Sequence, residues 1–213
     1  MAAYGATFNI DRQEMYDRTQ VVIRVLIMVV LSIIGGALGW AHGLLYLGIP
    51  VAAAVLISQK GAKAYFSESE QNMTLWLRYI ISFYAYIGLL TDKLPTKDSR
   101  ETVRFDVTPT GEPTAGRVLL RIILAITHAI VLALLSIVTF VLLVIAVIMI
   151  LISETYPEGI FKFLRGYMRW QVRLFVYLAG LVDEYPPFAL DTGEEAAAVP
   201  MLPAGEGSSA AAV

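Results

Sequence analysis

Two long apolar stretches without a single charged residue constrain this chain more than any other feature. Val25–Gln59 and Ile122–Ser153 contain 35 and 32 residues, and all 16 Lys and Arg and all 18 Asp and Glu residues lie outside them. Hydrophobic residues make up 57% of the chain and are gathered in these blocks, which is the pattern of burial in lipid. The sequence therefore predicts an integral membrane protein.

Each stretch is too long for one ordinary membrane span. One helical span needs about 20 residues, whereas a helix of 35 residues would be about 52 Å long. We therefore expect a helical membrane hairpin over 21–59, made of two short helices. Gly35, Gly36 and Gly39 favour a turn in its middle, and Pro50 shortens its second arm.

A second helical hairpin is expected over 118–153. Its turn candidate is Ser136–Thr139, and a single long tilted helix is the alternative, because this stretch has no Gly or Pro. Basic residues flank both stretches on each side, and such residues favour the cytoplasmic side of a membrane. Two hairpins keep all of them there, so we expect a multi-pass protein with both termini cytoplasmic, including the N-terminal segment 1–20.

The chain contains a candidate internal repeat of a hairpin followed by an aromatic-rich helix. Four residue types recur at a spacing of 91: Arg78 and Arg169, Tyr86 and Tyr177, Asp92 and Asp183, Pro95 and Pro186. Arg24 and Arg121 also precede the two apolar stretches. This register favours duplication, with repeat 1 over 21–95 and repeat 2 over 117–188; chance agreement is the alternative.

The remaining segments connect or follow the two units. A cytoplasmic linker over 96–116 contains Val103–Val107, which alternates as a short strand would, and Pro and Gly residues follow it. The tail over 189–213 is rich in Ala, Gly, Ser, Pro and Glu. We expect this tail to be disordered, because it has too little apolar surface to bury.

The helices expected after the hairpins, over 70–92 and 158–183, are amphipathic. In the second, basic residues at helical spacing form one narrow stripe opposite a wide apolar face. This pattern is typical of a helix lying among anionic headgroups, although the stripe can also face water while the apolar face packs on the hairpins. The residues expected to bind lipid or a partner are Lys162, Arg165, Arg169, Trp170, Arg173, Arg78 and Trp76.

The C-terminal half carries a family resemblance from about Arg117 to Phe188. It depends on Arg121 opening an apolar run that contains His128, on Arg169-Trp170, and most specifically on the terminal Asp183–Phe188. These residues resemble a bacterial membrane-protein family, the domain of unknown function DUF4389. The resemblance implies a protein of the bacterial cytoplasmic (inner) membrane, and it implies no activity. The first half resembles a degenerate copy.

Few ionisable residues are positioned for chemistry. His128 lies inside the second apolar stretch, where such a group is a functional candidate; a neutral imidazole bonded to a hydroxyl or carbonyl is the alternative. Asp92 and Asp183 are candidates for an ion or partner site, or for helix-end capping and salt bridges. The sequence has no phosphate-binding loop, nucleophile motif or metal motif, so we expect neither an enzyme nor a cofactor.

The predicted fold class is therefore an all-α integral membrane protein with two repeated units, each a hairpin followed by an interfacial helix. The expected function is a non-enzymatic membrane scaffold or accessory subunit, with a possible effect on membrane shape. Its expected partners are anionic lipid headgroups and either further copies of itself or a larger membrane complex, and not nucleic acid. The alternative is a small oligomeric transporter or channel.

Overall fold

The structure, a computed structural model, is mostly helical with one small sheet. It describes residues 4–35, 38–69, 72–93, 95 and 103–192 of the 213-residue chain, and of residues 31–35 and 38–42 the backbone alone. In chain order its elements are β1 (Ala6–Asn9), α1 (Arg18–Gly35), α2 (Leu38–Ser67), α3 (Met73–Ile87), β2 (Arg104–Val107), α4 (Ala115–Leu124), α5 (Ile126–Ser153) and α6 (Glu158–Leu178). The predicted all-α class is thereby corrected, because the described residues include two strands.

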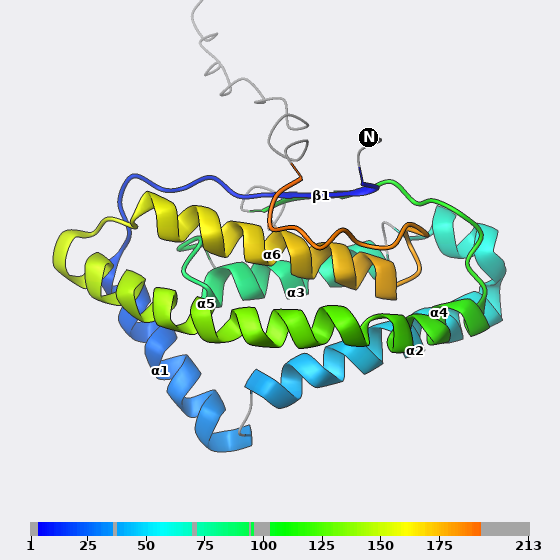
Figure 1. Ribbon diagram of the computed structural model, residues 1–213, viewed down its shortest axis with the longest axis horizontal. Coiled ribbons are helices and arrows are strands. Elements are labelled where there is room, and N and C mark those ends of the chain that lie inside the picture. The colour runs from blue at the N-terminus through cyan, green and yellow to red at the C-terminus, as the bar shows by residue number, and fades with distance from the viewer. Residues whose placement is uncertain (1–3, 36–37, 70–71, 94, 96–102, 193–213) are drawn as a thin grey trace, which may run out of the picture.

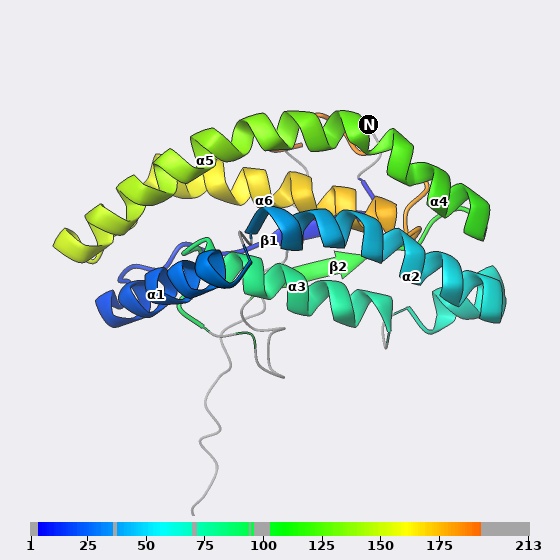
Figure 2. The same cartoon turned by 90° about the horizontal axis from the view of Figure 1, so that it is seen from below.

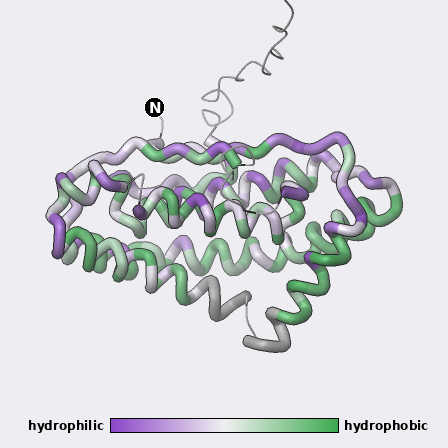
Figure 3. Tube along the Cα trace, turned by 180° about the vertical axis from the view of Figure 1, so that it is seen from behind, coloured by the Kyte–Doolittle hydropathy of each residue, from purple (hydrophilic) through white to green (hydrophobic). Residues whose placement is uncertain are grey.

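The elements form layers. β1 and β2 lie on one side, together with the chain that leads to α1, and α6 packs against β1 (Figure 1). The α4–α5 run lies along one flank of α6 and α3 along the other, so that α3 and α6 cover the same face of the strands (Figures 1 and 2). The corner between α1 and α2 is far from the sheet. Figure 3 shows that α1 is largely hydrophobic, whereas the chain around β1 is largely hydrophilic.

The first apolar stretch is divided between two helices. α1 ends at Gly35 and α2 begins at Leu38, so the break coincides with the glycine segment, of which residues 36 and 37 lie outside the described residues. α2 includes Pro50 and continues to Ser67, beyond the end of the stretch. A non-helical backbone at Gly61, with φ of 79°, interrupts it near its end.

The hairpin predicted over 118–153 is wrong. α5 is continuous through Ser136–Thr139, and α4 joins it at Ala125, whose backbone stays in the helical region. No Gly or Pro interrupts this stretch, and the hydroxyl of Ser136 donates to the carbonyl of Ala133 at 2.6 Å inside the helix. The alternative of one long helix is the observed one.

The strand predicted within Val103–Val107 forms as β2, and its partner is β1 of the same chain. The two strands pair antiparallel with Phe8 opposite Phe105. β1 lies inside segment 1–20, where no strand was expected. Both phenylalanines are buried and lie on one face of the sheet, since residues directly opposite each other in paired strands share a face.

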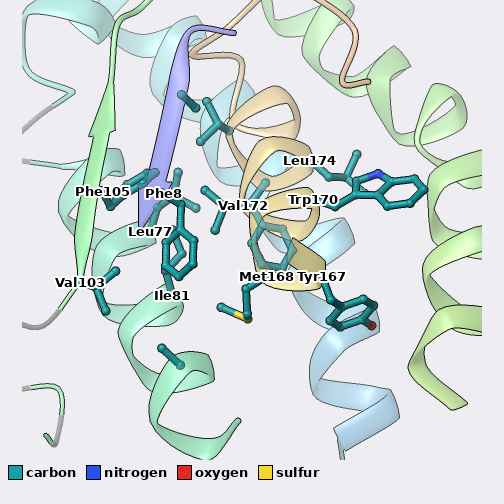
Figure 4. Close-up of a cluster of buried hydrophobic side chains, with 14 of the residues drawn as sticks. Phe8, Leu77, Ile81, Val103, Phe105, Tyr167, Met168, Trp170, Val172 and Leu174 are labelled. Atoms are coloured by element: carbon teal, nitrogen blue, oxygen red, sulfur yellow. The ribbon is translucent and has the colours of Figure 1, made fainter. Parts of the chain in front are cut away.

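The core lies where α6 and α3 meet the two strands. Figure 4 shows Phe8 and Phe105 against Leu77 of α3, with Val172 of α6 nearby. Every residue of α6 from Gly166 to Leu178 is buried. The helix predicted over 158–183 is therefore a central core helix in this fold and not a helix with one free face.

The predicted linker and tail are only partly described. Residues 96–102 of the linker and 193–213 of the tail lie outside the described residues. The tail was expected to begin at residue 189, but Ala189 and Asp191 are held by α6: the carbonyl of Ala189 accepts from Arg173, and Asp191 pairs with Arg169 at 2.6 Å.

Candidate functional site

A broad apolar surface covers the outer faces of α1, α2, α4 and α5. We call it the apolar surface, and its exposed side chains include Val22, Leu26, Val29, Leu44, Leu47, Val51, Val55, Leu120, Ile123, Ile126, Ile130, Leu134, Ile137, Phe140, Val141, Ile148 and Ile152. Soluble monomers rarely expose so large a continuous patch. Among the described residues, α2 from Gly43 to Ser67 and α5 are long and apolar enough to cross a membrane. Together they favour membrane association.

An aromatic stripe lies on the outer face of α3. Trp76 is 70% exposed, and Tyr79 and Phe83 follow it on the same helical face, both exposed. Trp and Tyr are the residues that prefer the membrane–water boundary. Of the predicted lipid-binding residues, Trp76 is therefore available on the surface.

The predicted basic stripe of α6 is largely buried, which corrects the expectation of an exposed face. Lys162 is exposed and pairs with Glu158 at 2.6 Å, and this contact lowers the pKa of Glu158. Arg165 is half-buried, and its burial lowers its pKa, as does the charge of Arg169. Arg169 and Arg173 are only 1% and 0% exposed.

Arg169 ties α6 to the N-terminal strand. Its Nε donates to the carbonyl of Phe8 at 3.1 Å, its Nη2 to Asn9 Oδ1 at 3.1 Å, and its Nη1 pairs with Asp191 at 2.6 Å. Arg78 of α3 makes a corresponding contact, because its Nη2 donates to the carbonyl of Phe105 at 3.1 Å. Phe8 and Phe105 are partners in the sheet, so each strand is held by an arginine from a different helix.

Two buried arginines pair with Asp92 and Asp183, the two aspartates predicted as candidates for an ion site or for salt bridges. Arg24 Nη2 lies 2.6 Å from Asp92 Oδ1, and its guanidinium lies 4.1 Å from the centre of the Tyr86 ring.

The second pair has the same composition. Arg121 Nη2 lies 2.5 Å from Asp183 Oδ1, and its guanidinium lies 4.5 Å from the centre of the Tyr177 ring. Burial raises the pKa of Tyr177, although the charge of Arg121 acts in the opposite direction. Both aspartates make salt bridges in this fold, which is the structural alternative to an ion or partner site.

His128 is buried in an aromatic cluster whose outer rings, Tyr185 and Phe188, are exposed. Trp170 Nε1 donates to His128 Nδ1 at 2.9 Å, Phe188 stacks on the imidazole at 4.0 Å between ring centres, and Tyr185 lies 4.8 Å away. Because Nδ1 accepts a hydrogen bond, this geometry assigns the proton of a neutral imidazole to Nε2. His128 is fully buried, and its bond is to an indole N–H instead of the expected hydroxyl or carbonyl.

The segment Asp183–Phe188, which carries the family resemblance, fastens the end of the chain onto α4 and α5. Asp183 pairs with Arg121, the Tyr185 hydroxyl donates to the carbonyl of Leu124 at 3.0 Å, and Phe188 stacks on His128. Trp170, a predicted lipid-binding residue, is buried under Phe188. This segment therefore supports the internal packing of the C-terminal half.

Two hollows border these elements. A polar one of about 530 Å³ is lined by Tyr16, Asp17, Arg18, Asp92 and Glu154, and Arg18 Nε pairs with Glu154 at 3.1 Å inside it. An apolar one of about 570 Å³ lies between α2 and the α4–α5 run. No group of three or more His, Asp or Glu residues that would hold a metal ion occurs in the part of the chain that the structure describes.

The sequence did not indicate the role of β1 and its neighbours. Phe8 and Asn9 receive hydrogen bonds from Arg169, yet neither was singled out. The available signal was the alternation of Ala6, Phe8 and Ile10, which parallels the alternation in Val103–Val107. Strands of four residues are too short to be recognised with certainty from alternation alone.

Comparisons with known proteins concern only the C-terminal half. No match was found among curated proteins, and none among solved structures. One family model matches, over the part that contains α4, α5, α6 and the Asp183–Phe188 segment. The predicted resemblance is thereby confirmed: residues 116–189 match the family described as a domain of unknown function, DUF4389.

Proposed function

We propose that this protein is a non-enzymatic membrane scaffold or accessory subunit, held in one leaflet of the bacterial cytoplasmic membrane by its apolar surface. In this arrangement α5 lies parallel to the membrane plane, and the side that carries β1 and β2 faces the cytoplasm. The observation that carries the proposal is the course of the segment from Tyr4 to Tyr16, which runs parallel to α5 with α6 between the two (Figure 1).

Hydrogen bonds fix both ends of this segment. The Tyr16 N–H donates to the carbonyl of Glu154, directly after α5, at 2.9 Å. The Tyr4 hydroxyl donates to the carbonyl of Glu184 at 3.2 Å, beside the Asp183 that pairs with Arg121. The 28 residues of α5 span about 42 Å, and an extended segment of this length spans about 40 Å.

The charges of the segment favour a flat orientation of α5. Asp11, Arg12 and Glu14 lie within it, and all three are exposed. If α5 crossed the membrane, these residues would enter the hydrocarbon beside it, at a cost of about 2.5–3.5 kcal/mol for each charge near the centre. If α5 lies flat, they stay in water while its apolar face enters the membrane to a depth of about 5–10 Å.

The same orientation supports the remaining parts of the proposal. The chain from Tyr4 and the chain that ends the described residues at Thr192 both lie on the side of the sheet, which supports two cytoplasmic termini. Trp76 lies on an exposed helical face suited to the headgroup region. The sheet side remains for a protein partner or a further copy, and the α1–α2 corner would act as a wedge in one leaflet.

We also propose that the two halves are duplicated units. The clusters Arg24–Tyr86–Asp92 and Arg121–Tyr177–Asp183 support this, because each places a buried arginine against a tyrosine ring and an aspartate. The helix ends support it too: Leu89 and Gly180, at the spacing of 91, both have left-handed backbones after α3 and α6. Phe8 and Phe105, at the spacing of Arg24 and Arg121, extend the correspondence to the strands.

A depth measurement along α5 tests the orientation. The chain has no cysteine, so spin labels can be attached at Ile130→Cys, Ile137→Cys and Ile148→Cys, one at a time. These side chains are 58%, 65% and 50% exposed and share one helical face. In vesicles of phosphatidylethanolamine and phosphatidylglycerol, we expect all three labels to report the same depth from their relative accessibility to oxygen and to a water-soluble nickel chelate.

A label at Lys162→Cys is the matched control, because Lys162 is exposed on the polar stripe of α6. We expect it to be accessible to the nickel chelate. Ile130 and Ile148 lie about 27 Å apart along the helix axis, so a crossing helix would give a profile that is deepest near Ile137. Such a profile would contradict the proposal and favour the alternative of an oligomeric transporter or channel.

A further inference from the structure

The apolar hollow between α2 and the α4–α5 run has the form of a groove. Residues from four helices, α2, α4, α5 and α6, line it, including Gly43, Tyr46, Leu47, Ala129, Ala133 and Tyr167. Its volume of about 570 Å³ falls in the range of sites that hold a small ligand. We propose that this groove holds one acyl chain of a membrane phospholipid, a proposal that rests on the proposed membrane function.

The lining chemistry favours a hydrocarbon chain. No charged side chain lines the groove. Two of its hydroxyls are used within the protein, since Ser136 donates to the carbonyl of Ala133 at 2.6 Å and Tyr167 to that of Leu132 at 3.4 Å. A polar ligand would leave its own groups without partners in such a site, whereas an acyl chain needs none.

The position of the groove gives it access to the acyl chains of the membrane. Leu47 and Ile126 both line the groove and belong to the exposed apolar surface, so the two are continuous. Where that surface contacts the hydrocarbon of the bilayer, the groove opens into lipid and water is excluded from it. Lipid chains are the only abundant occupant at that depth, and close packing against the groove walls is what would hold one there.

The wall of the groove has open space at Gly43. A Cβ added at Gly43 would meet no atom within 4 Å, so the space beside this residue is empty of protein. The same is true of Gly48, five residues further along α2, which does not line the groove. These two glycines therefore provide a matched pair of substitutions on one helix.

The test is native mass spectrometry of the full chain extracted from membranes in mild detergent. We expect the wild-type protein to carry one phospholipid. Gly43→Phe fills the groove and should lower that occupancy at least about fivefold, equivalent to roughly 1 kcal/mol. Gly48→Phe adds the same side chain outside the groove and should leave occupancy unchanged. Flotation of all three proteins with vesicles should be equal.

A second pair of substitutions, on α5, keeps the proposal testable if Gly43→Phe does not fold. Ala133→Phe fills the groove from α5 and should also remove the lipid, whereas Leu134→Phe on the exposed face of α5 should not. Equal occupancy in both members of each pair overturns the proposal, as does a wild-type protein without bound lipid. A retained free fatty acid overturns the phospholipid assignment, and a dimer lost on groove filling would identify a second copy as the occupant.

The outcomes separate this proposal from the orientation of α5. A peaked depth profile with a phospholipid lost only from the groove-filling variants would overturn the flat orientation and leave the groove occupied. Equal depths of the three labels, with the same lipid occupancy in all variants, would support the flat orientation and overturn the lipid site in the groove.

Discussion

Replacing Arg169 with methionine should lower the free energy of unfolding by at least about 3 kcal/mol. Methionine keeps most of the apolar stem but removes three contacts, to the carbonyl of Phe8, to Asn9 Oδ1 and to Asp191. Phe8 is buried, so its carbonyl loses this donor without gaining water, whereas Asn9 Oδ1 keeps the hydrogen bond from the Ile10 N–H at 3.0 Å. Chemical denaturation in detergent micelles, followed by circular dichroism, measures the loss.

Lys162→Met is the matched control on the same helix. Lys162 lies two turns before Arg169, it is exposed, and its pair with Glu158 is a surface contact one turn apart. Such pairs contribute only a few tenths of a kcal/mol, so we expect a change below about 0.5 kcal/mol. Small and equal changes in the free energy of unfolding for the two variants would mean that Arg169 is not a core residue. They would favour the exposed basic stripe predicted from the sequence.

The stripe shows what helical spacing can and cannot predict. The positions of Lys162, Arg165, Arg169 and Arg173 correctly indicate one helical face, because the 3.6-residue period fixes it. They do not indicate what lies against that face. β1 and Ala189–Asp191 come from the two ends of the chain and cover Arg169 and Arg173, and such long-range contacts leave no local signal.

The second apolar stretch was misinterpreted for a related reason. Hydrophobicity and length set the expectation of two short spans, since every long helix was assumed to stand across the membrane. The continuous α5 has no turn in this stretch, and the segment from Tyr4 to Tyr16 runs parallel to it on the other side of α6. The first stretch was divided correctly because Gly35 and its neighbours supply a local break.

The ionisable candidates were partly predictable. Salt bridges were an alternative for Asp92 and Asp183, and the bases nearest them in the fold are Arg24 and Arg121, the residues that mark the repeat. A neutral, bonded His128 was also an alternative, but its donor could not be foreseen. Trp170 is 42 residues away, and only the packing of α6 along α5 brings the two rings together.

Replacing Arg121 with methionine should lower the free energy of unfolding by about 3–5 kcal/mol. Its Nη1 donates to the carbonyls of Tyr177 and Val182 at 2.6 and 2.8 Å, and its Nη2 pairs with Asp183. These contacts join α4 to the end of α6, so their loss leaves the Val182 carbonyl without this donor and frees the Asp183–Phe188 segment, while the Tyr177 carbonyl keeps the hydrogen bond from the Gly180 N–H. The same denaturation measurement, with near-ultraviolet circular dichroism for the aromatic cluster, detects both effects.

Arg24→Met is the matched variant in the other half, and we expect it to cost at least about 2 kcal/mol less. Arg24 is as deeply buried as Arg121 and pairs with Asp92, but its Nε and Nη1 have no hydrogen-bond partner among the described residues. Hydrogen bonds therefore offset less of the free energy that Arg24 loses when its charge is removed from water. Methionine carries no charge, so its substitution avoids part of that loss. Equal losses in the two variants would contradict this difference, and would mean that the two clusters contribute alike despite their unequal hydrogen bonding.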